Sequence, residues 1–162
     1  VTHDQEEAFS IADRVILMRD GKVEQAGTPE ELYNHPATKY AARFLGLSNL
    51  IPGTARIENN VQIIDTSIGK FHSTGDTQGP TTLLIRPDSA EINGTEGFSL
   101  NGIIVEKIFQ GNLCQVVISI NGTNLKFYFL TNTTIPEINE HIQFSINPAG
   151  IVPILESQTN NE

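Results

Sequence analysis

The chain has 162 residues, of which 38% are hydrophobic and 18% charged, so it can form one or two small domains with a real core and is not expected to be disordered. The net charge of −9 is spread over both halves without a basic patch, which argues against nucleic acid and anionic lipid as direct partners. No run approaches the ~20 apolar residues that cross a bilayer, so direct membrane insertion is not expected, and the single Cys114 excludes an intrachain disulfide.

The start of the chain predicts a strand that runs into a helix. Residues 1–2 are typical of the end of a buried strand, and Asp4 with Glu7 three residues later predicts a helix over 5–13. His3 therefore lies between a strand end and a helix start. In open α/β sheets this is where ligands bind.

The next residues predict a β-hairpin and two helices. The hairpin is indicated by an apolar run, a two-residue Asp-Gly turn and a returning strand, and the first helix by a hydroxyl cap with Pro at the first helical position. The expected elements are a mostly buried strand Arg14–Arg19, the turn Asp20-Gly21, a strand Lys22–Ala26, a helix from Thr28-Pro29 to His35-Pro36, and a helix Ala37–Leu45 with Gly46 as its C-cap.

This ordered series resembles the end of the nucleotide-binding subunit of an ABC transporter. The matching segments are VTHDQEEA at 1–8, ADR at 12–14 and DGKVEQAGTPEELY at 20–33. The resemblance implies that the first of these is the switch-histidine (H-loop) segment. It also implies that His3 is catalytic, contacting the γ-phosphate of ATP and helping to hold the attacking water.

Other parts of that ATPase machinery are absent from the sequence. There is no Gly-x-x-x-x-Gly-Lys-Ser/Thr loop to cradle phosphates and no Leu-Ser-Gly-Gly-Gln signature. We therefore expect a C-terminal fragment whose parent protein uses ATP and Mg²⁺, whereas the fragment alone binds no cofactor and is inactive.

The composition changes at about Ser48, after which Gly, Asn, Thr, Val and Ile dominate. Short apolar runs then recur every 8 to 12 residues or so between turn signals, which predicts a small all-β barrel or sandwich, and no internal repeat stands out. The expected strands are Gly53–Glu58, Val61–Thr66, Lys70–Ser73, Thr82–Arg86, Gly102–Phe109, Cys114–Asn121, Asn124–Leu130, His141–Ile146 and Ile151–Leu155, with a loop at Thr74–Pro80.

This second half resembles the regulatory TOBE domain that follows the ATPase domain in ABC importers. The matching motifs are LIRPD at 84–88, GIIVE and FQG within 102–111, and the Asn-Gly turn at 121–122, although Asp88 stands where the family usually has Glu. The resemblance implies an oligonucleotide-binding-fold-like β-barrel. The expected fold class is thus α+β but mainly β, with residues 1–48 ending a nucleotide-binding domain, 49–156 forming the barrel and 157–162 a disordered tail.

Arg86 is the other candidate site residue. It is expected to brace the barrel through backbone carbonyls, or alternatively to contact an anion, because a guanidinium suits oxyanions.

The family resemblance implies the regulatory part of the ATP-hydrolysing subunit of a bacterial ABC importer, which couples ATP hydrolysis to small-solute uptake. It implies a homodimer that works with transmembrane permease subunits, in the cytoplasm at the inner face of the cell membrane. The solute stays open between iron, polyamine, sugar, sulfate and phosphonate. The alternative is a small-oxyanion-binding module of the molybdate-binding type, against which stand only five Lys and Arg residues in 51–162.

Overall fold

The structure, a computed structural model, describes residues 5–76 and 78–155 and is mainly β, as expected. None of its described helices is long and apolar enough to cross a lipid bilayer. In chain order the elements are α1 (Gln5–Ile11), β1 (Val15–Arg19), β2 (Lys22–Gly27), α2 (Pro29–Asn34), α3 (Lys39–Phe44), β3 (Leu50–Glu58), β4 (Val61–Thr66), β5 (Gly69–Ser73), β6 (Gly79–Ile85), β7 (Ala90–Ile92), β8 (Phe98–Gln110), β9 (Leu113–Ile120), β10 (Thr123–Leu130), β11 (His141–Ile146), the 3-10 helix η1 (Pro148–Gly150) and β12 (Ile151–Leu155).

The first part of the chain forms the predicted helices and hairpin. Asp20 and Gly21 both have positive φ, as the two-residue turn between β1 and β2 requires. Helix α2 begins at a capping box, in which the Glu31 amide donates to the Thr28 hydroxyl at 3.1 Å and the Thr28 amide donates to the Glu31 carboxylate at 2.8 Å. The C-cap of α3 is Leu45, one residue before the predicted Gly46, and Gly46 follows it with the positive φ that is common directly after a helix.

The prediction that residues 14–19 are mostly buried is wrong for this structure. Among the described residues, strand β1 pairs with β2 alone, and within β1 only Leu17 is buried. Ile16 and Met18 are 62% and 55% exposed, because no other described strand or helix covers the outer face of this two-stranded sheet.

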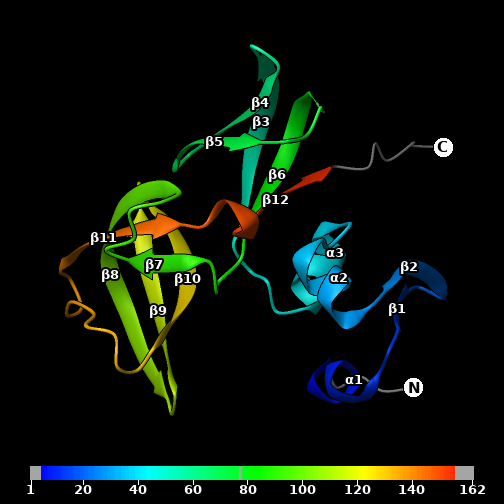
Figure 1. Ribbon diagram of the computed structural model, residues 1–162, viewed down its shortest axis with the longest axis horizontal. Coiled ribbons are helices and arrows are strands. Elements are labelled where there is room, and N and C mark those ends of the chain that lie inside the picture. Colours follow the sequence, from blue (N-terminus) through cyan, green and yellow to red (C-terminus); the bar gives the residue numbers. More distant parts are fainter. Residues whose placement is uncertain (1–4, 77, 156–162) are drawn as a thin grey trace.

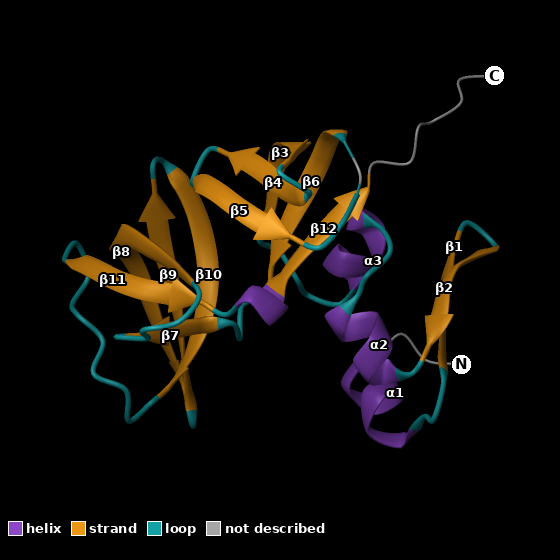
Figure 2. Cartoon of the chain, turned by 45° about the horizontal axis from the view of Figure 1, so that its top comes forward, coloured by secondary structure: helices purple, strands orange, loops and turns teal. Residues whose placement is uncertain are grey.

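The rest of the chain folds into two curled five-stranded antiparallel sheets (Figures 1 and 2). One has the strand order β12-β6-β3-β4-β5 and is called here the first sheet; the other has the order β7-β11-β8-β9-β10 and is called the second sheet. All nine predicted strands are present, and the hairpin turns at Asn59-Asn60 and Asn121-Gly122 have the positive φ that such turns need. Strand β7 was not predicted, and β6 begins at Gly79, inside the segment expected to be a loop.

The two sheets are copies of one arrangement that exchange their last strand. Strands β3, β4, β5 and β6 occupy the same positions in the first sheet as β8, β9, β10 and β11, respectively, occupy in the second. The fifth strand of each copy joins the other sheet: β7 pairs with β11, and β12 pairs with β6. The crossing is closed by a matched pair of backbone hydrogen bonds, from Arg86 N to Gly150 O at 2.8 Å and from Asn147 N to Ser89 O at 2.9 Å. The structure thus reveals an internal repeat that does not stand out in the sequence.

Two hydrophobic cores hold the chain together. The larger core fills the space between the sheets and takes buried residues from both. The smaller core joins the helices to the outer face of the first sheet, where Leu32, Ala41 and Ala42 lie in one cluster with Leu84 and Ile154. The fold class, mainly β with an oligonucleotide-binding-like arrangement of curled sheets, is confirmed.

The predicted domain boundaries stay predictions. The smaller core contains buried residues from both sides of the expected boundary after residue 48. The expected tail, 157–162, lies outside the described residues.

Candidate functional site at the junction of helices and sheets

The predicted catalytic residue, His3, lies outside the described residues, so its surroundings are not defined. The second candidate, Arg86, lies at the crossing of the two sheets. It directly follows β6, and its carbonyl accepts from the Ser89 amide at 3.1 Å and from the Ser89 hydroxyl at 2.6 Å. The next carbonyl, of Pro87, accepts from the Tyr128 amide on β10 at 2.9 Å. The main chain at Arg86 is therefore tied to both sheets.

The Arg86 side chain reaches away from the sheets to helix α2. One terminal nitrogen donates to the side-chain oxygen of Asn34, and the other donates to Asp88 at 3.3 Å. The guanidinium carbon lies 5.4 Å from the centre of the Tyr33 ring, within cation–π range. Arg86 thus contacts side chains of α2 and Asp88 and not the backbone carbonyls that the sequence suggested.

Tyr33 closes this group from the helix side. Its hydroxyl donates to Asp88 Oδ1 at 3.3 Å. Burial, assisted by the negative charge of Asp88, raises the pKa of the Tyr33 phenol to about 12, while the nearby Arg86 acts in the opposite direction. Tyr33 is therefore a stable hydrogen-bond donor at physiological pH.

The surroundings of Arg86 do not favour an oxyanion. The adjoining cavity of about 310 Å³ is lined by Arg86 together with two acidic residues, Asp88 and Glu91. The Arg86 Nε lies 3.3 Å from Asp88 Oδ1 and has no hydrogen-bond partner of acceptable geometry. An added anion would have to displace the Asp88 carboxylate and would face the charge of Glu91.

Three of the four other Lys and Arg residues in 51–162 lie beside carboxylates, the exception being Lys126. Arg56 contacts Glu58 and Asp65, and Lys70 lies 3.8 Å from Asp65. Lys107 is 3.1 Å from Glu137 and also donates to two backbone carbonyls. Among the described residues, these cations form no cluster that lacks matching carboxylates, so their charges do not favour the oxyanion-binding alternative.

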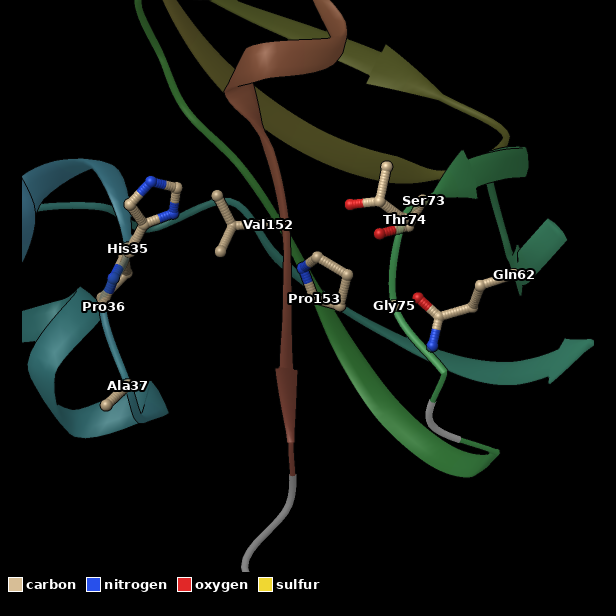
Figure 3. Close-up of a pocket in the computed structure, with 9 residues that line it drawn as sticks. All are labelled: His35, Pro36, Ala37, Gln62, Ser73, Thr74, Gly75, Val152 and Pro153. Carbon is tan, nitrogen blue, oxygen red and sulfur yellow. The ribbon is translucent and has the colours of Figure 1, made fainter.

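A second cavity, of about 400 Å³, lies between the α2–α3 connection and the first sheet (Figure 3). Figure 3 shows His35 and Pro36 on one side, Val152 and Pro153 of β12 in the middle, and Ser73, Thr74 and Gln62 on the other side. Its helix-side wall is held by Gln25, which donates to the His35 carbonyl and accepts from the Ala37 amide, each at 2.9 Å. The described residues of its lining include no Asp, Glu, Lys or Arg and form no arrangement for acid–base or nucleophilic chemistry.

Sequence reasoning missed Asn49, the residue that joins the linker to both sheets. Its side chain is buried, donates to the Ile85 carbonyl at 3.1 Å and to the Lys126 carbonyl at 2.7 Å, and accepts from the Lys126 amide at 2.8 Å. It thereby covers part of the outer edge of β10. A single polar residue in a linker gives no sequence signal for such a role.

The internal repeat did leave a signal in the sequence. Ile85-Arg86-Pro87 and Ile146-Asn147-Pro148 share the pattern Ile-x-Pro, and both segments end a central strand and lead into the exchanged one. The pattern is too short to indicate a repeat by itself. The matched backbone hydrogen bonds of the crossing show that its two copies occupy equivalent positions.

Comparisons with known proteins show which proteins this chain is similar to. No protein-family model matches the chain. The spermidine/putrescine import ATP-binding protein PotA of Borrelia garinii subsp. bavariensis is 34% identical over 151 residues, which is 93% of this chain and 43% of that protein. PotA of Mesoplasma florum is 32% identical over 153 residues, with the same coverage of both chains. The Fe(3+) ions import ATP-binding protein FbpC of Streptomyces avermitilis is 43% identical over 113 residues, 68% of this chain and 31% of that protein.

The chain is homologous to ATP-binding subunits of ABC importers. The resemblance drawn from its sequence is thereby confirmed. The chain spans less than half the length of these relatives, so the activity of a whole subunit does not follow from the match alone.

A solved structure supports the fold. The cytoplasmic molybdate-binding protein ModG, with molybdate bound, aligns with 67% of this chain and 96% of its own at a TM-score of 0.53 and 10% sequence identity. At this identity the likeness concerns the fold alone and not the ligand.

Proposed function

We propose that this chain is the C-terminal, regulatory part of the ATP-hydrolysing subunit of a bacterial ABC importer, coupling ATP hydrolysis to small-solute uptake. The observation that carries the proposal is the extent of the match. The relatives named as import ATP-binding proteins align with 93% of the chain, a share that includes both the helices and the two sheets. Isolated similarity of the β fold would not extend into the helices.

Within this proposal, ATP and Mg²⁺ belong to the complete subunit. The chain contains no phosphate-binding loop of the Gly-x-x-x-x-Gly-Lys-Ser/Thr type, so no step of hydrolysis is derived from the described residues. His3 is assigned the contact with the γ-phosphate. Phosphoryl transfer depends mainly on positioning and charge stabilisation, which an imidazole at that point provides.

We infer a cationic solute from the names of the relatives. Those with the widest coverage are named for spermidine and putrescine, and another is named for Fe(3+). A polyamine is therefore the first solute to test, and iron the second. The subunit would work in the cytoplasm, attached to permease subunits at the inner face of the membrane.

The test is transport by the assembled importer. The complete subunit is expressed with its permease, purified and placed in proteoliposomes, and uptake of labelled spermidine is measured with Fe(3+) and molybdate in parallel. We expect the two proteins to purify together and spermidine to accumulate only with ATP. A complete subunit that neither binds the permease nor drives ATP-dependent uptake of any of the three solutes would contradict the proposal.

The same proposal includes a homodimer, and the outer face of the second sheet supports it. Ile103 and Ile108 on β8 and Leu130 on β10 are exposed there, which leaves apolar area without cover from the described residues. Glu106 and Lys126 stand in one cross-strand row with Val117 between them. Opposite charges on one face let two copies related by a two-fold axis pair with each other.

Light scattering of this chain at micromolar concentration tests the dimer. We expect a mass near twice 17.8 kDa, reduced to one chain by Ile108→Glu. Val61→Glu, which places the same charge at an exposed apolar residue of the first sheet, is the matched control and is expected to leave the dimer intact. A mass of one chain at every concentration would contradict the dimer.

A further inference from the structure

The helices meet the first sheet through two kinds of contact. One is the smaller hydrophobic core, where Leu32 of α2 lies in a cluster with Leu84 and Ile154. The other is the polar group formed by Tyr33, Asn34, Arg86 and Asp88. Hydrophobic contact is strong but non-directional, so it holds two surfaces together without fixing their relative rotation. The directional contacts of the polar group must therefore fix the rotation of the helices relative to the first sheet.

We propose that Arg86 is a positioning residue that fixes the orientation of helix α2, and with it the helical part, relative to the two sheets. Its guanidinium is held from three directions: the face of the Tyr33 ring, the side-chain oxygen of Asn34 and the carboxylate of Asp88. Two of these three partners belong to α2. A planar guanidinium held in this way allows one orientation of the helix, which a flexible ammonium would not.

The other end of the residue is equally fixed. The Arg86 amide donates to the Gly150 carbonyl at 2.8 Å, and its carbonyl accepts from Ser89, so its backbone belongs to the crossing of the two sheets. Pro87, the next residue, holds the edge of β10 through the Tyr128 amide. One side chain therefore connects α2 to the point where both sheets are joined.

The internal repeat supplies a built-in comparison. Asn147 is the counterpart of Arg86: it follows β11 as Arg86 follows β6, it precedes a proline, and its amide makes the matching hydrogen bond across the crossing. The Asn147 side chain only accepts from the Ala149 amide two residues on. Because the crossing forms with Asn at one of the two positions, its geometry does not require arginine. Arginine is present in the copy of the repeat whose side chain at this position contacts helix α2.

The environment of Arg86 fits positioning better than stabilisation. Its side chain is only 15% exposed, and the buried Nε lacks a hydrogen-bond partner of acceptable geometry. Taking a charge out of water opposes the gain from pairing it, so a buried ion pair is weak support for stability. Asp88 is 47% exposed and stays solvated if Arg86 is removed. Replacing Arg86 with an apolar residue of similar length should therefore leave the fold intact while releasing α2.

The test is a distance measured within this chain. Spin labels are attached to Glu30→Cys on α2 and Asn112→Cys at the β8–β9 turn, both exposed, in a Cys114→Ser background. The labelled chain is diluted with an excess of unlabelled chain, so that pulsed electron paramagnetic resonance gives the distance distribution within one chain. We expect one narrow distribution in the parent chain and a broad one in Arg86→Met. Arg56→Met is the matched control, because Arg56 is also paired with two carboxylates but wholly within the first sheet.

Hydrogen exchange gives a second readout. The Leu32 and His35 amides close the hydrogen bonds of α2, and in Arg86→Met they should exchange about tenfold faster or more, the effect of losing one hydrogen bond to a charged group. Amides of β8 and β9 should keep their rates. A residue that only stabilises the whole fold would change both sets together and leave the distance distribution narrow.

A narrow, unchanged distribution in Arg86→Met would overturn the proposal, and so would equal broadening in Arg56→Met. If Arg86→Met does not fold, Asn34→Ala is measured instead, because it removes the acceptor of the Arg86 hydrogen bond on α2. A broad distance distribution in Asn34→Ala would support the proposal, and a narrow, unchanged one would overturn it. These measurements need no ATPase activity, so their failure would leave the proposed function standing. Under that function, the joint would make the helices and sheets move as one body.

Discussion

At the scale of single residues, the protonation of the Tyr33 phenol affects the stability of the folded chain. Burial and Asp88 raise its pKa from 10.0 to about 12. Below pH 10 both the folded and the unfolded chain hold the phenol proton. Between about 10 and about 12 the unfolded chain releases it first, so rising pH favours unfolding.

We therefore expect the free energy of unfolding to fall more steeply over this pH range in the parent chain than in Tyr33→Phe. Urea unfolding of the two chains at a series of pH values measures the difference, in which the contributions of the groups that both chains share cancel. Tyr40→Phe serves as the control. Parallel curves for the parent chain and Tyr33→Phe would show that Tyr33 does not titrate as the structure requires.

Asn49 gives a second prediction at this scale. Asn49→Ala removes three side-chain hydrogen bonds. The Ile85 and Lys126 carbonyls and the Lys126 amide thereby lose the Asn49 side chain as their partner. Each polar group left buried without a partner costs about 1–3 kcal/mol, so the free energy of unfolding should fall by at least about 2 kcal/mol. Asn124→Ala, at an exposed residue of β10, should change it by no more than about 0.5 kcal/mol. A loss at Asn49 as small as that control would contradict the bridging role.

The sequence identified Arg86 but not what Arg86 does. Its motif is local, whereas its helix-side partners, Tyr33 and Asn34, are some fifty positions away and are brought close only by the packing of α2 on the first sheet. Asn49 was missed for the same reason, because its acceptor on β10 is 77 residues distant.

At the scale of elements, the crossing of the two Ile-x-Pro segments leaves no room for a side chain at Gly150. A Cβ there would lie 2.1 Å from Ser89 Cβ, so Gly150→Ala should destabilise the chain by about 1–3 kcal/mol. In the double variant with Ser89→Gly the clash is removed, although the Ser89 hydrogen bond to Arg86 is lost. We expect the double variant to be more stable than the sum of the single effects by about 1 kcal/mol, measured by a double-mutant cycle. Strictly additive effects would mean that the two residues do not meet.

The strands and turns were predicted well because their signals are local. Alternating apolar residues and positive-φ turns such as Asn59-Asn60 act within a few residues. The exchange of β7 and β12 was not predicted. Strand β7 has only three residues, and its pairing with β11 instead of β6 depends on contacts that no periodicity encodes.

At the scale of the whole molecule, the sequence predicted a mainly β chain that begins like the end of an ABC ATPase domain. The structure confirms the first point, and the relatives support the second. The sequence did not predict how the parts join. Leu84 and Ile154 look like ordinary residues of buried strands, yet they belong to the core beneath the helices, whereas their neighbours Leu83 and Ile151 belong to the core between the sheets. A strand buried on both faces carries no sign of which partner covers which face.

Under the proposed function, His3 acts on the reacting phosphate in the complete ATP-hydrolysing subunit. ATP binding and hydrolysis are measured for the complete subunit and its His3→Ala variant, with His35→Ala as the control at an exposed histidine. We predict that His3→Ala lowers turnover by about a hundredfold or more while the affinity for ATP stays close to that of the parent. The His35→Ala variant should keep both. Near-normal turnover in His3→Ala would rule out the role assigned to His3 and, with it, the proposed place of this segment in ATP hydrolysis.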